Sequence, residues 1–158
     1  MANEPSLHIP YLYNYAGQPW KTQKRIRMLL QQWFRNDLMG VPGDEDGGGM
    51  SAFVAFSKMG FYPVTPGSPT YNIGSPIFEK SVIDIGDNKT FTIIANNVSE
   101  ENKYIQSATL NGQEWNQPWF NHAAIQNGGE LVLVMGKTAN KKWGVDSNLA
   151  PPSAEKID

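Results

Sequence analysis

The stretch PVTPGSPTYNIGSP, residues 63–76, divides the chain into two parts of different character. Its prolines and glycines interrupt any long helix or central strand, because proline lacks a backbone N–H and glycine weakens both kinds of element. Apolar residues before this stretch follow a helical period, whereas those after it occur in short runs typical of strands. The sequence therefore predicts an α+β fold: helices first, then a small antiparallel β-sheet or sandwich unit, with the boundary near residues 67–76.

Helices are predicted at three places before the boundary. A short one covers residues 6–15 and ends at Gly17, a longer one follows Pro19, and a third ends at Gly60. The apolar stripe of the second helix consists of Ile26, Leu29, Leu30 and Trp33, and that of the third of Phe53, Phe56 and Met59. These apolar faces are more surface than the helices can bury against one another. The helical part is therefore expected to belong to a larger structure.

Strands are predicted over residues 77–85, 91–95, 104–110 and 131–135. The dipeptide Asn111-Gly112 is a strong signal for a hairpin, and one helical turn is expected over residues 120–125. The polar tail, residues 149–158, is expected to fray. The predicted organisation is a helical segment 1–66, an antiparallel β unit 67–148 and a disordered tail 149–158.

The composition argues against several classes of function. The 158 residues include 13 basic and 15 acidic ones, and the net charge of −2 gives no general attraction to nucleic acid or an anionic membrane. The absence of cysteine excludes disulfides, thiol catalysis and thiolate metal sites. No apolar run approaches the ~20 residues that cross a bilayer, and the polar N-terminus is unlike a signal peptide. Neither nucleic acid nor a membrane is expected as a partner.

The stretch GDEDGGGMSA, residues 43–52, is the strongest candidate for chemistry, because three carboxylates precede three consecutive glycines and an apolar helix. Each glycine would cost a helix about 0.8–1.0 kcal/mol relative to alanine, so helix formation does not explain them. Two explanations are open. Either a ligand approaches the main chain here, with Gly48 as a contact, or the backbone adopts angles that only glycine tolerates.

Asp44 and Asp46 are the candidate catalytic residues of this stretch. In an extended loop, side chains two residues apart share a face, whereas on a helix they would point apart. The positive end of the helix that follows would keep both carboxylates ionised, as a general base requires. The alternative is that the two aspartates only cap the helix and form a turn.

Further motifs occur in a fixed order along the chain, from Asn3 to about Trp143. They are Asn3-Glu4-Pro5-Ser6, residues 9–14, residues 16–23, residues 42–52, residues 59–64 and residues 71–76. Together they resemble the C-terminal part of glycoside hydrolase family 92, whose members are calcium-dependent exo-acting α-mannosidases, many of them α-1,2-mannosidases. The chain departs from the family pattern at Ala2, where glycine is usual, and at Leu7, where histidine is frequent.

The resemblance implies a longer parent enzyme with an N-terminal β-sandwich and a C-terminal (α/α)6 barrel. This chain would supply the last helices of the barrel and the strands that trail it. The parent is expected to act on mannose-containing glycans and to be secreted, periplasmic or exposed on the cell surface. The exposed apolar helix faces of the fragment are expected to promote self-association.

The resemblance also assigns roles to the acidic stretch. Asp46 is expected to be the general base of an inverting reaction, with Asp44 as a helper or an alternative base. In an inverting glycosidase the base faces a carboxylic acid about 6.5–9.5 Å away, so these aspartates form only one half of the pair. The general acid of the family is a glutamate upstream of this chain. The isolated chain is therefore expected to be inactive.

The N-terminal residues complete the list of candidates. Glu4 and Asn3 resemble part of the family's calcium and sugar environment, and carboxylate and amide oxygens suit calcium. His8 is expected either to line the sugar site or to pack in the core. An alternative function is a non-catalytic carbohydrate-binding or structural module, in which the acidic stretch is only a turn.

Overall fold

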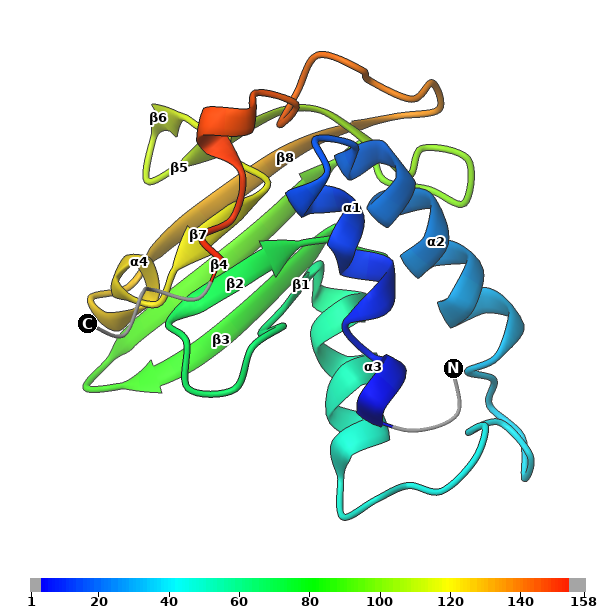
Figure 1. Cartoon of the computed structure of the whole chain (residues 1–158). Coiled ribbons are helices and arrows are strands. Elements are labelled where there is room, and N and C mark those ends of the chain that lie inside the picture. The colour runs from blue at the N-terminus through cyan, green and yellow to red at the C-terminus, as the bar shows by residue number, and fades with distance from the viewer. Residues whose placement is uncertain (1–3, 154–158) are drawn as a thin grey trace.

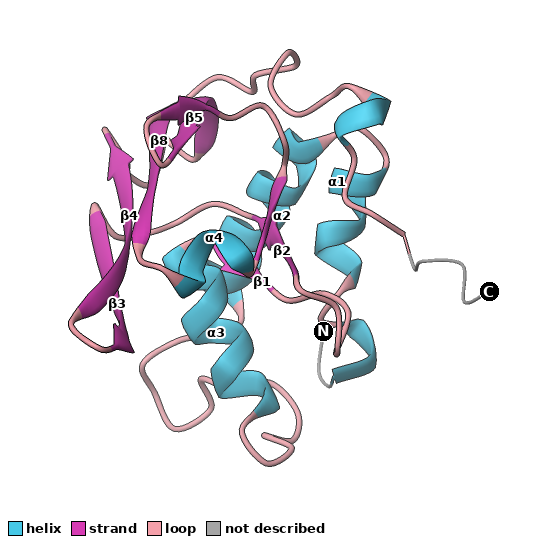
Figure 2. Ribbon diagram, turned by 90° about the vertical axis from the view of Figure 1, so that its left-hand side faces the viewer, coloured by secondary structure: helices cyan, strands magenta, loops and turns pink. Residues whose placement is uncertain are grey.

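A computed structural model, which describes residues 4–153, places helices α1, α2 and α3 beside two β-sheets (Figure 1). The chain begins with the 3-10 helices η1 (Glu4–Ser6) and η2 (Ile9–Tyr11), which lead into α1 (Leu12–Tyr15). The longer helices are α2 (Pro19–Gln32) and α3 (Gly49–Met59). Figure 2 shows the larger sheet on one side of the molecule and α1 and α2 on the other. The predicted α+β class is confirmed.

The strands form a three-stranded and a five-stranded sheet. The smaller one has the order β1-β2-β7, with β1 (Phe61–Tyr62), β2 (Thr70–Ile73) and β7 (Trp119–Asn121). The larger one has the order β3-β4-β8-β5-β6, with β3 (Lys80–Gly86), β4 (Lys89–Asn96), β5 (Tyr104–Leu110), β6 (Gln113–Glu114) and β8 (Gly129–Gly136). The short helices α4 (Ala123–Gln126) and η3 (Ser147–Leu149) lie outside the sheets.

One pair of strands in the larger sheet departs from the expected antiparallel arrangement. Strands β4 and β8 are parallel, with Ile93 opposite Leu131, while every other pair in the two sheets is antiparallel. A parallel pair needs a long crossover, and the segment between β4 and β8, which contains β5, β6, β7 and α4, provides it. Periodicity predicts strands but not their partners, so this pairing could not be predicted from local patterns.

Helix boundaries follow local signals, with one correction. Pro19 begins α2, where its missing N–H costs nothing, and Gly60 ends α3 with a left-handed φ of 107°. Trp33 was predicted to lie on the buried stripe of α2, and this is wrong: its side chain is 54% exposed. The helix ends at Gln32, so the 3.6-residue period no longer applies, and Phe34 enters the core instead.

Two apolar clusters form the core. The larger one lies between the sheets, where Phe120 of β7 stacks near Phe91 of β4 at a ring-centroid distance of 5.7 Å. The smaller one joins the N-terminal segment to α2 and α3, through Leu7, Ile26 and Phe53. This second cluster brings the first residues of the chain against α3.

Buried amide side chains connect the helices to the sheets. Gln23 of α2 accepts a hydrogen bond from the backbone N–H of Ile105 in β5, at 3.1 Å. The fully buried Asn14 of α1 places its Nδ2 within 3.1 Å of the carbonyl oxygens of Ile73 and Pro118 and of Asn72 Oδ1. In the interior such bonds are costly to lose, because the carbonyl oxygens left behind have no access to water.

The predicted boundary near residues 67–76 therefore lies inside a continuous structure. Strand β1, which follows α3 directly, pairs with β2 on the other side of the proline-rich stretch. The division into a helical segment and a β unit stays a prediction.

Of the predicted tail, residues 149–153 are described, and Trp119 Nε1 donates to the carbonyl oxygen of Leu149 at 3.1 Å. Residues 154–158 lie outside the described part. Within residues 4–153, no helix is long and apolar enough to span a bilayer.

We expect the substitution Asn14→Asp to lower the free energy of unfolding by about 2–4 kcal/mol. The carboxylate has nearly the shape of the amide but donates no hydrogen bonds, and it would face acceptor oxygens in the interior. Urea unfolding followed by circular dichroism measures the loss. The matched control Asn127→Asp, at an exposed position after α4, should change stability by less than about 0.5 kcal/mol. Equal effects of the two substitutions would contradict the role given to Asn14.

Candidate functional site

The acidic stretch forms an exposed loop that leads into α3. Its backbone turns through three consecutive left-handed residues, Asp46 with a φ of 55°, Gly47 with 65° and Gly48 with 104°. A Cβ added to Gly47 or Gly48 would meet no atom within 4 Å, so space is not the constraint there. The glycines are needed because side chains strain the left-handed conformation. Backbone angle thus explains these two glycines; a ligand contact at Gly48 stays a prediction.

Glu45 holds this loop to the first turn of α3. Its Oε1 accepts a hydrogen bond from the backbone N–H of Ser51 at 3.0 Å, and its Oε2 accepts one from the N–H of Gly48. The hydroxyl of Ser51 and these two backbone N–H groups hold the pKa of Glu45 below its usual value. The first N–H groups of a helix lack partners within the helix, so this carboxylate acts as the cap.

Local sequence patterns predicted a capping role for Asp44 and Asp46 as an alternative, but not the capping role of Glu45. The cap position itself is Gly48, which has no side chain to offer. The three left-handed residues fold the chain back, so that the carboxylate of Glu45, three residues before Gly48, reaches the start of the helix. The order of residues contained a signal for this cap, since the glycines that begin two residues after Glu45 allow the chain to reverse. The distance of Glu45 from Ser51, six residues, is outside the usual capping patterns.

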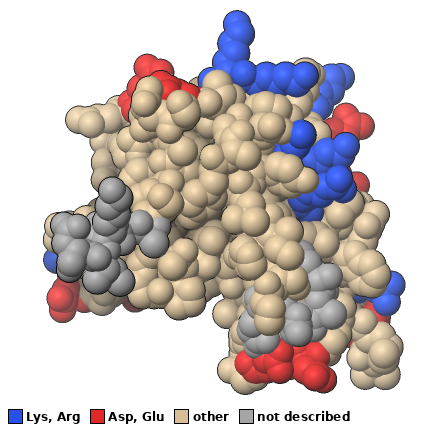
Figure 3. Space-filling view, viewed as in Figure 1, with Lys and Arg blue, Asp and Glu red and all other residues tan. Residues whose placement is uncertain are grey.

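The two candidate catalytic residues lie on either side of Glu45. Asp44 and Asp46 are both exposed, in the loop that leads into α3 (Figure 1). The space-filling view shows acidic side chains gathered at the end of the molecule where α3 begins (Figure 3). The arrangement offers carboxylates to a ligand that approaches from outside this chain.

The N-terminal candidates come to the same end of the molecule. Leu7 packs in one cluster with Met50 and Phe53, which belong to the first turns of α3, and Figure 1 shows η1 beside this part of the helix. His8 is half-buried, so the structure leaves both of its predicted roles open. Asn3 lies outside the described residues, and so does the side chain of Glu4.

The described residues contain no metal site built from acidic or histidine side chains. Within residues 4–153, no three His, Cys, Asp or Glu side chains lie close enough together to hold a metal ion. His122, the second histidine, lies beside Tyr71, with 2.9 Å between its Nδ1 and the tyrosine hydroxyl. Calcium binding by Asn3 and Glu4 stays a prediction.

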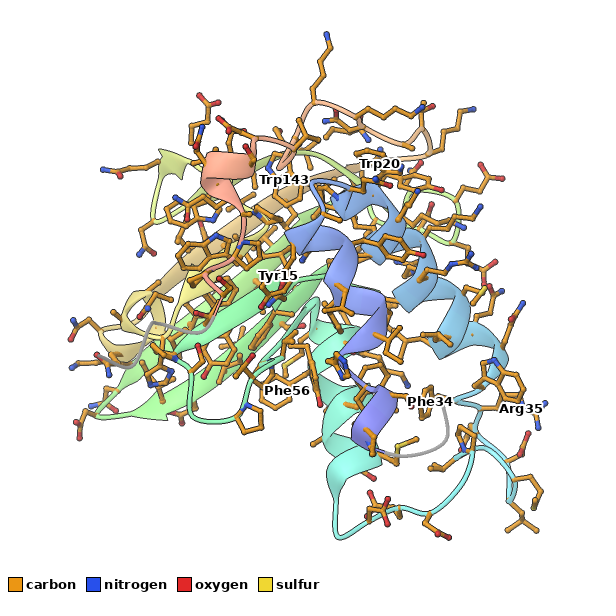
Figure 4. The ribbon with its side chains drawn as sticks, viewed as in Figure 1. Tyr15, Trp20, Phe34, Arg35, Phe56 and Trp143 are labelled. Atoms are coloured by element: carbon orange, nitrogen blue, oxygen red, sulfur yellow. The ribbon has the colours of Figure 1, made fainter. Side chains whose placement is uncertain are left out.

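Three of the described aromatic side chains, Tyr11, Trp20 and Trp143, do not form an open sugar platform beside the acidic loop. Tyr11 is completely buried, its hydroxyl lies 2.9 Å from Ser57 Oγ, and desolvation by burial raises its pKa. Its ring stacks on that of Tyr62 at 5.4 Å. Figure 4 shows Trp20 and Trp143 at the opposite end of the molecule from the loop. Tyr11 thus belongs to the core.

Comparison with known proteins agrees with the resemblance seen in the sequence. Residues 1–137 match the model of the glycosyl hydrolase family 92 catalytic domain. The chain is 40% identical, over 156 residues, to an uncharacterized secreted glycosidase of Arthroderma benhamiae; the match covers 97% of this chain and 20% of that protein.

Solved structures give the same result. The family GH92 α-mannosidase BT3965 from Bacteroides thetaiotaomicron, in complex with mannoimidazole, superposes with a TM-score of 0.92 at 38% identity. The family GH92 inverting mannosidase BT2199 from the same species superposes with a TM-score of 0.90 at 42% identity. Each match covers 96% of this chain and 20% of the other, so the chain spans about a fifth of the length of its relatives. The motifs, the family model and the shared fold together show that the chain belongs to glycoside hydrolase family 92.

Proposed function

We propose that this chain supplies the general base of an exo-acting α-mannosidase that removes terminal mannose from glycans with inversion. The observation that carries the proposal is the exposed carboxylate loop at the start of α3, in a chain whose solved relatives are named mannosidases. One relative is named as inverting, and another is a complex with mannoimidazole. The family's frequent preference for α-1,2 linkages is proposed with it.

In this mechanism Asp46 takes a proton from a water molecule. The oxygen of that water attacks the anomeric carbon, on the face opposite the bond that breaks, while an acid elsewhere in the parent protonates the leaving oxygen. The sugar therefore leaves with inverted configuration. Asp44 is the helper or the alternative base. Because this chain carries only the base, we propose that it is inactive by itself.

Calcium and the cellular location belong to the same proposal. The sugar's hydroxyls would be held by calcium, with Glu4 and Asn3 as ligands from this chain and further oxygens from the rest of the parent. His8 and Gly48 are the proposed contacts to mannose. Location outside the cytoplasm is supported by the Arthroderma relative, which is described as secreted.

The alternative, a non-catalytic carbohydrate-binding or structural module, makes a different prediction for Asp46. In the full-length parent, Asp46→Asn should lower kcat on an α-mannoside by about 10²–10⁴-fold, because the amide cannot accept the proton from water. Steady-state kinetics measure this loss, with Asp87→Asn, in the exposed turn between β3 and β4, as the matched control. Activity of Asp46→Asn close to that of the parent would favour the alternative.

The isolated chain is proposed to self-associate, but not through the apolar helix faces expected from the sequence, because Ile26, Leu29 and Phe53 on those faces are buried. The connection between α2 and α3 exposes a group of apolar side chains: Trp33 at 54%, Leu38 at 104%, Met39 at 80% and Val41 at 44%. Burial of apolar surface stabilises a contact by about 25 cal/mol per Å².

We expect sedimentation velocity of residues 1–158 to show association that increases with concentration. The double substitution Leu38→Ser, Met39→Ser should weaken it, since both side chains are exposed in the loop. The matched control Val82→Ser, on the exposed edge strand β3, should have less effect. A strict monomer at all concentrations would refute self-association without affecting the catalytic proposal.

A further inference from the structure

The loop that carries Asp46 has few restraints of its own. Gly47 and Gly48 lack side chains, and a Cβ added to either would meet no atom within 4 Å. The backbone hydrogen bonds inside the loop are long: 3.3 Å from Gly49 N to Asp46 O, and 3.3 Å from Met50 N to Glu45 O. Consecutive glycines without packing contacts give a flexible backbone, because glycine populates many conformations.

The carboxylate of Glu45 supplies the missing restraint. It bridges the loop by accepting from Gly48 N and from Ser51 N, so that one side chain spans the segment in which Asp46 lies. Hydrogen bonds to an ionised acceptor are roughly twice as strong as neutral ones. Ser51 sits in the first turn of α3, next to Met50, which is fully buried. Glu45 therefore links the loop to a helical turn that is packed in the core.

Glu45 is poorly suited to act as a base itself. Each of its two carboxylate oxygens already accepts a backbone hydrogen bond, and its pKa is lowered by those bonds and by the Ser51 hydroxyl. A carboxylate that holds protons weakly and whose oxygens are already engaged in hydrogen bonds is a poor acceptor for a proton from water. Its contribution must come through geometry.

We propose that Glu45 is a positioning residue, which holds Asp46 in the orientation needed to take a proton from water by bridging Gly48 and Ser51. The inference rests on the proposed role of Asp46 as general base. A general base acts only within hydrogen-bond reach of the proton it abstracts, and a misplacement of about 1 Å can cost ~100-fold in rate. The left-handed conformation of Asp46 becomes the stable one because Glu45 closes the loop around it.

The test uses the full-length parent enzyme with the substitution Glu45→Ala. We expect kcat to fall by about 100-fold while KM for an α-mannoside changes by less than about threefold, since Gly48 is the only proposed sugar contact of this chain that lies in the loop. Glu45→Gln keeps one acceptor oxygen and should fall between Glu45→Ala and the unchanged enzyme. The matched control Glu79→Ala, an exposed glutamate before β3, should leave kcat unchanged.

A control with Ser51→Ala separates the backbone bridge from the serine hydroxyl. Because Ser51→Ala keeps the backbone N–H that donates to Glu45, it should lower kcat far less than Glu45→Ala does. Hydrogen exchange measured by mass spectrometry should show faster exchange for the peptide 45–52 in Glu45→Ala, with other peptides of the chain unchanged. Faster exchange throughout the chain would mean a general structural role and would overturn the proposal.

The outcomes also separate this inference from the proposed function. If Asp46→Asn is inactive and Glu45→Ala keeps the full kcat, Asp46 remains the base and the positioning role is refuted. If Asp46→Asn retains activity, the proposed base is wrong, and the positioning role fails with it. A graded loss in Glu45→Gln and Glu45→Ala, with Asp46→Asn inactive, supports both.

Discussion

Hydrogen bonds from two buried amides hold the helices against the sheets, and the placement of the candidate site depends on them. Asn14 donates to the carbonyl oxygens of Ile73 in β2 and of Pro118 just before β7, and Gln23 accepts from the backbone N–H of Ile105 in β5. Apolar contacts alone would allow the helices to slide on the sheets, because they have little directional preference. Directed bonds in the interior select one arrangement.

The position of the acidic loop, residues 43–48, depends on this arrangement of helices and sheets. With α1 and α2 anchored, Leu7 reaches the cluster that also contains Met50, and the N-terminal segment lies against the start of α3. The acidic loop then projects from a helix whose first turns are fixed in the core. A rigid helix that carries an exposed loop is a common way to place reactive groups precisely against a ligand bound by other parts of an enzyme.

The acidic loop combines strained backbone angles with the hydrogen bonds of Glu45 that restrain them. Three left-handed residues in succession are unfavourable for ordinary side chains, and only one of them, Asp46, has a side chain at all. Glu45 compensates through hydrogen bonds to the N–H groups that a helix start leaves unpaired. The two aspartates are thereby left on either side of a carboxylate that is already committed to structure.

Local patterns in the sequence determined a large part of this protein. The change of period around residues 63–76 indicated the α+β class, Pro19 and Gly60 marked helix ends, and Asn111-Gly112 marked the hairpin between β5 and β6. The acidic residues before α3 stood out as candidates by their neighbours alone. These features can be predicted from the sequence because helix periods, turns and caps depend on residues only a few positions apart.

Tertiary structure decided what depends on residues far apart in the chain. The parallel pairing of β4 with β8, the exposure of Trp33 and the partners of Asn14 could not be predicted, since each depends on segments that meet only after folding. Glu45 is the most instructive case: it lies beside the aspartates in sequence, but its role appears only when three left-handed residues return it to the helix. Sequence determined which groups are present, and the folded backbone decided that Glu45 is the acid that holds the loop to the start of α3.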